Sequence, residues 1–471
     1  VRRAYLQAQA RREVYVELPE EDQEEGMCGK LVKSMYGTRD AAQNWEEEYC
    51  SFMEQLGFKR GIGSPCVFYH EGRDMRAVIH GDDFTLLADE KHLDWFKVRI
   101  GEKFEVKYRG RLGPKETDDK AIRVLNRVIT WRDDGLVYEP DQRHAEIIVK
   151  MLDNDIGNKT LTSPGRRVKP VEFKEDELDE LLPRKATMFR ALSARANYLS
   201  QDRADIRFAV KEISRHMSKP RKVDWEALVR LGKYLKAKPR WTQSFGYQES
   251  TSQHSNKFVN VCVDTDFAGC LETRKSTSGG VVMLNKHVVK TWSVTQDLIA
   301  LSSGEAEYYG LVRGGAQGLG IISLLKDLGV ERKLKLKTDA SVAKSIASRR
   351  GLGKLRHVET NQLWLQQRVN LGHIEVEKIK GTENPADLLT KYKELESIKL
   401  YAGWTNCSFE LGRHELMPQV SEKEGSVEDP WEGPVNKDDE EAEQMVNWIG
   451  RRVMRSRQTV NLFWYSEPEL S

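Results

Sequence analysis

The sequence contains little cysteine, which excludes a fold built on disulfides. Its 471 residues include six cysteines, and none of them forms a CxxC or a Cys/His metal-binding spacing. Scattered thiols in a chain of this length are typical of a reducing compartment. The sequence also lacks a run of 18 apolar residues and a secretory signal pattern. We therefore expect no membrane partner and predict an intracellular location, cytoplasmic or nuclear.

A large excess of charge of either sign is absent as well. The chain has 75 Lys and Arg against 73 Asp and Glu, which gives a net charge of +2. The total charge therefore predicts no partner, and any nucleic-acid surface must come from local clusters of basic side chains. Hydrophobic residues make up 39% of the sequence, enough to fill the cores of two or three domains.

Changes in composition divide the chain into segments. A polar, turn-rich stretch, Gln248–Lys257, marks a domain boundary. An acidic stretch, Ser421–Glu443, is expected to be a disordered linker. We predict a mixed α+β fold in which the last segment is a charged, partly disordered tail. The predicted segments are residues 1–160, 161–247, 257–392 and 393–471.

The segment 257–392 has the most regular pattern of apolar residues. Three hairpin-like strands come first, and a long helix and then strand–helix units follow. This order predicts a mixed five-stranded sheet with helices on its faces. The expected strands are Phe258–Val263, Gly280–Leu284, His287–Trp292, Leu334–Lys337 and Ile374–Ile379, and the expected helices are Gly304–Leu328, Ala340–Ser348, His357–Leu371 and Pro385–Lys391.

Acidic residues of this segment fall at strand ends and on helices, where side chains from distant parts of the chain can converge. They are Asp264 after the first strand, Glu307 in the long helix, Asp339 after the fourth strand and Asp387 in the last helix. Mg²⁺ prefers oxygen ligands. Two such ions about 3.5–4 Å apart activate water and stabilise the leaving oxygen in phosphodiester cleavage. The pattern predicts a site for two Mg²⁺ ions, with Mn²⁺ as a substitute.

Each of these acids also has a simpler interpretation. An acidic residue at a strand end or a helix start is often a cap or a solvated charge. Asp266, Glu305 and Glu383 lie nearby and compete for the same roles. Glu305 and Glu307 are two residues apart and point to different faces of the helix. The sequence does not decide which of the two faces inward.

The motifs of residues 257–392 resemble the ribonuclease H of Ty1/copia-type retrotransposon polyproteins. The similarity runs through VDTDFAGC, TRKSTSGG, LSSGEAEYYGL, TDASVA and NPADLLTK. It implies a ribonuclease H-like fold that cleaves the RNA strand of RNA–DNA hybrids. It also implies that the catalytic metal ligands are Asp264, Glu307, Asp339 and Asp387. Ala340 stands where the family has asparagine. The loop Lys380–Pro385 lacks the histidine of many cellular and retroviral enzymes, which lowers the expected rate.

Residues 1–240 resemble the later part of a copia-type reverse transcriptase. The similarity lies in Lys30–Phe58 and in Phe189–Leu235. It implies a truncated palm over residues 1–160 and a helical thumb or connection over residues 161–247.

The adjacent pair Asp82 and Asp83 follows an apolar strand in AVIHGDDFTLLAD. Two aspartates at a turn between strands either bind catalytic Mg²⁺ in a polymerase palm or are the solvated acids of a hairpin. The family motif reads Tyr-Val-Asp-Asp, so His80 and Gly81 are departures from it. The family's first catalytic aspartate would precede Val1, and the chain is expected to be a fragment of a longer protein. We therefore predict that this chain, as given, does not polymerise DNA.

Local clusters of basic residues supply the expected nucleic-acid surface. Such residues hold backbone phosphates, and a solvated loop is the alternative interpretation. The expected contacts are Arg274, Lys344, Arg349, Arg350, Lys354 and Arg356. A hybrid is recognised by its shape and its 2′-hydroxyls, so little sequence preference is expected.

These features predict an enzyme, a metal-dependent RNA–DNA hybrid ribonuclease within a retrotransposon polyprotein. The alternative is a decayed or repurposed element that binds nucleic acid without cutting it. Loss of cleavage on substitution of Asp264 would separate the two.

Overall fold

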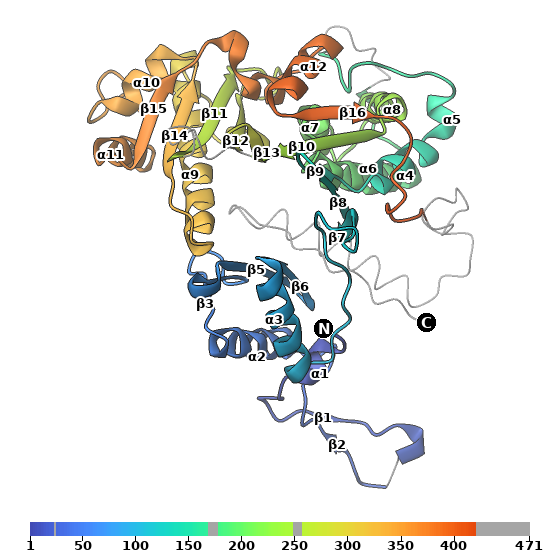
Figure 1. The fold of residues 1–471 in the computed structure, drawn as a ribbon. Helices are drawn as coiled ribbons and strands as arrows, with labels where there is room; N and C mark the ends of the chain where they lie inside the picture. Colours follow the sequence, from blue (N-terminus) through green and yellow to red (C-terminus); the bar gives the residue numbers. More distant parts are fainter. Residues whose placement is uncertain (23–24, 168–177, 248–256, 421–471) are drawn as a thin grey trace. The chain divides into compact units, whose positions relative to one another are not determined.

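The computed structural model describes residues 1–22, 25–167, 178–247 and 257–420, and these form four β-sheets (Figure 1). The expected acidic linker, 421–443, lies outside the described residues, as does nearly all of the expected boundary, 248–257. Among the helices of the described residues, none combines the length and the apolar character that a membrane span requires.

Residues 1–104 contain a four-stranded antiparallel sheet in the order β3-β4-β5-β6. Helices α2 and α3 share one apolar core with its strands, and the rings of Trp45, Phe52 and Phe104 meet edge to face there. The elements are α1 (Ala4–Gln7), β1 (Tyr15–Val16), η1 (Glu20–Asp22), β2 (Gly29–Lys30), α2 (Ala41–Gln55), β3 (Lys59–Arg60), β4 (Val67–His70), η2 (Glu71–Arg73), β5 (Met75–His80), β6 (Asp83–Leu87) and α3 (Glu90–Lys103).

A second, fully antiparallel sheet has the order β16-β10-β9-β8-β7. Its strands come from three of the four predicted segments, so pairing between distant parts of the chain joins those segments. They are β7 (Ala121–Val124), β8 (Arg127–Arg132), β9 (Gly135–Glu139), β10 (Arg240–Gly246) and β16 (Cys407–Glu410).

The helical region around this sheet is held by an apolar core and by one buried ion pair. The guanidinium of Arg203 donates to both carboxylate oxygens of Asp205, and the hydroxyl of Tyr234 donates to the same carboxylate. The helices are α4 (Arg143–Met151), α5 (Asp153–Ile156), α6 (Pro183–Ser200), α7 (Ala204–Ser214), α8 (Lys222–Ala237) and α12 (Leu395–Trp404).

The third large sheet has the order β13-β12-β11-β14-β15. Strands β11, β12 and β13 are antiparallel, while β14 and β15 run parallel to β11. This confirms the predicted mixed five-stranded sheet with flanking helices. Its elements are β11 (Phe258–Asp266), β12 (Thr277–Leu284), β13 (His287–Thr295), α9 (Ser303–Asp327), β14 (Lys333–Thr338), α10 (Ser341–Ser348), η6 (Thr360–Leu363), α11 (Trp364–Asn370), β15 (Ile374–Lys378), η7 (Gly381–Glu383) and η8 (Pro385–Leu389).

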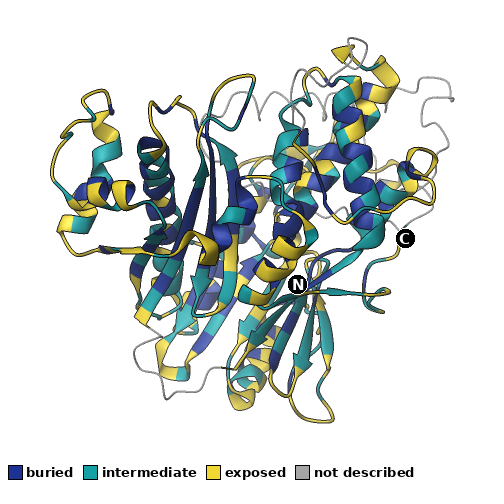
Figure 2. Cartoon of the chain, turned by 90° about the horizontal axis from the view of Figure 1, so that it is seen from above, coloured by how far each residue is buried: buried dark blue, intermediate teal, exposed yellow. Residues whose placement is uncertain are grey.

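Successive side chains of β11 point to opposite faces of the sheet, toward α9 on one face and α7 on the other. Val261 and Val263 belong to the core under α9, whereas Cys262 belongs to the core shared with α7. Asp264 has the same parity as Cys262, so it lies on the α7 side of the sheet. Both faces are covered, and the central strands β11 and β12 are largely buried (Figure 2).

The last two predicted helices are shorter than their patterns suggested. Where a helix was predicted over 357–371, the structure has the 3₁₀ turn η6 followed by α11. Where a helix was predicted over 385–391, it has the 3₁₀ turn η8. In η8 the Asn384 side chain accepts from the Ala386 N–H, and this cap fixes a tight turn beside β11.

Candidate metal centre

Side-chain oxygens of Asp264, Glu307 and Asp339 all lie within 4.8 Å of one another. Asp264 is near the end of β11, Asp339 directly follows β14, and Glu307 is in the second turn of α9. Strands β11 and β14 are parallel neighbours, so their carboxyl ends meet at one edge of the sheet. The structure therefore brings together three of the four predicted ligands.

Asp264 is a buried carboxylate with one firm partner. It is 7% exposed, and the Thr390 hydroxyl donates to its Oδ2. Burial raises the pKa of Asp264, the Thr390 hydrogen bond lowers it, and the nearby charge of Asp387 raises it again. A cation beside this carboxylate would offset the burial cost.

Glu307 is a largely buried carboxylate with one partnered and one unpartnered oxygen. Its Oε1 accepts from the Thr265 N–H at 3.2 Å, while its Oε2 is buried and has no partner among the described residues. Burial and repulsion from Asp264 and Asp339 raise its pKa to about 9. A buried acceptor without a donor is rare and needs an explanation, and a divalent cation supplies one.

Asp387 falls outside this three-residue group. Lys391 Nζ lies 2.5 Å from its Oδ1, and Lys393 forms an ion pair with its Oδ2. The carboxylate is thus held by two ammonium groups beside the cluster. Its role as the fourth ligand stays a prediction.

The structure distinguishes the two glutamates between which the sequence could not choose. Both are turned inward, but Glu305 enters a separate network. It is 1% exposed, accepts from the Tyr309 hydroxyl at 2.8 Å and lies 2.9 Å from His357 Nε2. This network links the start of α9 to the end of residues 349–356, which we call the basic loop. Sequence reasoning missed it, although the four-residue spacing of Glu305 and Tyr309 on a helix was a usable signal.

The other two competing acids lie outside the group. Asp266 is half-buried, and burial raises its pKa while Arg167 and Lys391 lower it. Glu383 pairs with Lys380 at 3.3 Å, and both side chains are exposed.

The pair Asp82 and Asp83 lies at the turn between β5 and β6. Gly81 has a φ of 58°, which favours glycine, and its carbonyl accepts from the Trp45 indole N–H at 2.8 Å. Asp83 lies 3.9 Å from Arg109. Among the described residues, this pair belongs to no group of three ligands. The expectation that the chain does not polymerise DNA stays a prediction.

The six predicted phosphate contacts have different surroundings. Arg350, Lys354 and Arg356 are exposed, and so is Arg274, whose φ is 58°. Lys344 on α10 is partly exposed. Arg349 instead donates to the Leu352 carbonyl within its own loop. Arg349 therefore shapes the basic loop, and the exposed residues remain available to a ligand.

The strand order and the acidic group are those expected of a ribonuclease H-like domain. A family model for reverse transcriptase (RNA-dependent DNA polymerase) matches residues 1–114. A retrovirus-related Pol polyprotein from transposon TNT 1-94 of Nicotiana tabacum is 25% identical over 83% of this chain and 29% of its own length. The Ty1-JR2 Gag-Pol polyprotein of Saccharomyces cerevisiae is 25% identical over 84% of this chain and 23% of its own length.

These matches confirm the motif resemblance: the chain is similar to part of the Pol polyproteins of Ty1/copia-type retrotransposons. It spans about a quarter of the length of these curated relatives. Solved structures with similarity include LC11-RNase H1 in complex with an RNA/DNA hybrid, at 13% identity over 28% of this chain and 93% of that chain, with a TM-score of 0.20. A foamy viral protease-reverse transcriptase in complex with an RNA/DNA hybrid has 10% identity over 80% of this chain and 45% of that chain, with a TM-score of 0.40.

Proposed function

We propose that this chain is a metal-dependent endonuclease that cleaves the RNA strand of RNA–DNA hybrids. The observation that carries the proposal is the convergence of Asp264, Glu307 and Asp339 within 4.8 Å, with one buried Glu307 oxygen unpartnered. Like charges this close are stable only when they are protonated or share a cation.

The residues present fit a hard divalent cation. The three side chains of the group offer only carboxylate oxygens, which suit Mg²⁺ and Mn²⁺ better than softer metals. A pair of such ions, when bound, lowers the pKa of water and stabilises the leaving oxygen of a phosphodiester. Asp264, Glu307 and Asp339 would hold the metal, and Asp387 is proposed to join them.

The protein's own groups orient these ligands. The Thr390 hydroxyl fixes Asp264, and the Thr265 N–H fixes one oxygen of Glu307. Thr265 lies in β11 itself and Thr390 directly follows η8, which packs beside β11, so the carboxylates are positioned before any substrate arrives. The exposed basic residues of the 350–356 loop are proposed to hold backbone phosphates of the hybrid.

A second candidate function is nucleic-acid binding without cleavage. The observation that favours it is the pairing of Asp387 with both Lys391 and Lys393. A carboxylate that keeps these partners in the presence of metal would leave the site with three ligands.

The test is cleavage of a labelled RNA–DNA hybrid in Mg²⁺ or Mn²⁺ by the full chain. Cleavage of the RNA strand that disappears in Asp264→Asn supports the nuclease. Binding of the hybrid without cleavage by both proteins contradicts it and supports the second candidate. Ser397→Asp, on the exposed face of α12, serves as a control that should cleave like the wild type.

A further inference from the structure

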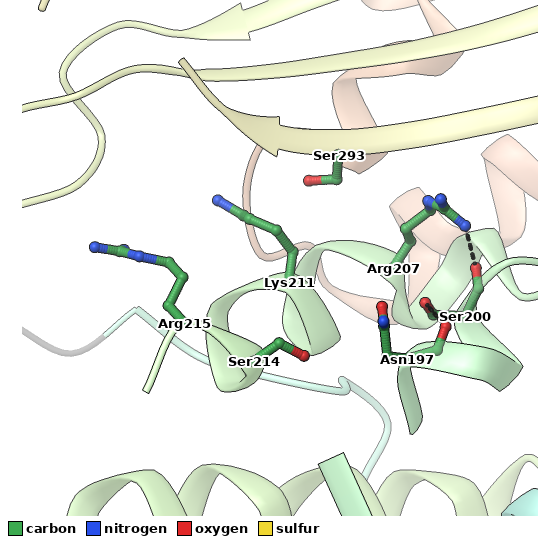
Figure 3. A pocket seen from close by; sticks show the side chains of 7 residues that line it. All are labelled: Asn197, Ser200, Arg207, Lys211, Ser214, Arg215 and Ser293. Atoms are coloured by element: carbon green, nitrogen blue, oxygen red, sulfur yellow. Dashed lines mark hydrogen bonds between the residues drawn. The ribbon is translucent and has the colours of Figure 1, made fainter. Parts of the chain in front are cut away.

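A cavity of about 260 Å³ lies between α7 and the sheet strand β13, outside the acidic group. Arg207, Lys211 and Arg215 line it from the α7 side, and Ser293 lines it from β13. In Figure 3 the side chains of Lys211 and Arg207 rise from α7 toward the strand that carries Ser293. The α7 helix and the sheet share one apolar core, so the cavity has firm walls.

The cavity has an excess of positive charge. Its cations recur every four residues, a spacing that places them on one side of a helix. Lys211 and Arg215 share a single carboxylate, Glu212. Within the described part of the chain, Arg207 forms no ion pair, and its guanidinium donates to the Ser200 carbonyl at 2.8 Å. Three of the residues that line the cavity are cations and none is a carboxylate, which favours an anionic ligand.

Hydroxyl groups without partners also line the cavity. Ser214 Oγ and Ser293 Oγ are buried, and neither has a hydrogen-bond partner among the described residues. Buried hydroxyls are normally satisfied. Hydroxyl donors beside guanidinium and ammonium groups suit the oxygens of a phosphate.

The cavity lies within reach of the acidic group. Asp264 pairs with Gly279 on β12, and Gly279 pairs with Ser293 on β13, so the three residues form one row across the sheet. Two strand spacings separate Asp264 from Ser293, roughly 10 Å. Lys211 also donates to Thr277, the residue that pairs with Asp266. A nucleic acid at the acidic group therefore passes close to the cavity.

We propose that this cavity binds a backbone phosphate of the RNA–DNA hybrid, as a contact separate from the metal centre. The proposal rests on the proposed function only in taking the hybrid as the partner. The Arg, Lys and Ser side chains of the cavity offer donors that suit phosphate oxygens, and the amide of Asn197 lies beside them. A phosphate contact therefore adds affinity without sequence preference and places the duplex at a fixed distance from Asp264.

The experiment measures binding of a fluorescent RNA–DNA hybrid to the full chain carrying Asp264→Asn, without divalent ions and over a range of salt. Adding Ser293→Asp puts a carboxylate where the phosphate would lie and should weaken binding roughly tenfold. The slope of log K against log salt should fall by about 0.9, the value for one lost phosphate contact. Arg207→Gln should act in the same direction, and Ser397→Asp, with the same added charge, should change neither quantity.

Two results overturn the proposal. One is affinity and salt slope in Ser293→Asp and Arg207→Gln equal to those of Ser397→Asp. The other is a loss of tripolyphosphate binding in these variants with hybrid binding unchanged, which would mark the cavity as a site for free oligophosphate. Cleavage plays no part in this assay, so a failure of the nuclease proposal would appear separately, as hybrid binding by a wild-type chain that does not cut.

Discussion

At the residue scale, burial and the nearby charges of Asp264 and Asp339 raise the pKa of Glu307 to about 9, far above its ordinary value of 4.5. Between these pH values the folded chain holds a proton that the unfolded chain has lost. The contribution of Glu307 to the free energy of unfolding is therefore fully present below pH 4.5 and is lost as the pH rises toward 9.

The direction of this pH dependence gives a prediction for the stability of the metal-free protein. Without divalent ions, stability toward urea should fall between about pH 6 and about pH 8.5. Mg²⁺ should reduce the fall because it favours the carboxylate form. Glu307→Gln, which has no ionisable group, should show a smaller fall and a weaker response to Mg²⁺. Equal pH slopes in the two proteins would contradict the raised pKa.

Lys393 offers a second test at the residue scale, because it pairs with Asp387, the carboxylate that we propose as the fourth metal ligand. Lys393→Gln frees one carboxylate oxygen and removes a nearby positive charge. We expect Mg²⁺ to bind roughly threefold to tenfold more tightly, the effect of about 1 kcal/mol of electrostatic repulsion removed. Calorimetric titration measures the change. Lys399→Gln, which breaks an exposed pair with Glu396, is the matched control, and equal affinities in the two variants would refute a competition between Lys393 and the metal.

At the scale of elements, the approach of α9 to the sheet positions Glu307. A Cβ on Gly314 would lie 2.6 Å from Val263 Cγ2, and one on Gly318 would lie 2.4 Å from Leu334 Cδ1. Glycine at these positions lets the helix backbone come close to β11 and β14. The distance between Glu307 and the aspartates follows from this contact.

Gly314→Ala should therefore lower stability by about 1–3 kcal/mol, as expected for overpacking, and should weaken Mg²⁺ binding because α9 moves outward. Gly320→Ala lies on the same helix, and its Cβ would meet nothing within 4 Å. That control should gain up to about 1 kcal/mol, since alanine favours helix. Urea unfolding of both variants measures the two changes in the free energy of unfolding. Equal changes would contradict a role for the close contact between α9 and the sheet.

The start of α7 depends on the buried pair of Arg203 and Asp205, in which both side chains are almost fully buried. Arg203 also donates to the carbonyls of Lys238 and Pro239, just before β10. Arg203→Met should cost about 3–5 kcal/mol, because Asp205 keeps an uncompensated buried charge. Adding Asp205→Leu should recover part of that loss. A double variant less stable than Arg203→Met would contradict the charge argument.

At the scale of the whole molecule, the sequence predicted local patterns better than distant pairings. The order of strands and helices in residues 257–392 was enough to predict the mixed five-stranded sheet. The pairing of β10 with both β9 and β16 was not predictable, because short strands more than 100 residues apart leave no local signal of their register.

In the candidate site as well, the sequence predicted the residues of the motifs but not their side-chain contacts. Motif order identified Asp264, Glu307 and Asp339, which the structure brings together. The sequence could not show that Lys391 and Lys393 hold Asp387, or that Glu305 binds His357. Those contacts depend on side-chain directions in short turns, which spacing alone does not fix.

The central claim is that Asp264, Glu307 and Asp339 hold a divalent cation. Its most direct test is anomalous diffraction from crystals of the chain soaked in Mn²⁺. We expect an anomalous peak among these three carboxylates that disappears in Glu307→Gln. A soaked crystal with Mn²⁺ at other surface acids and none among these three would contradict it.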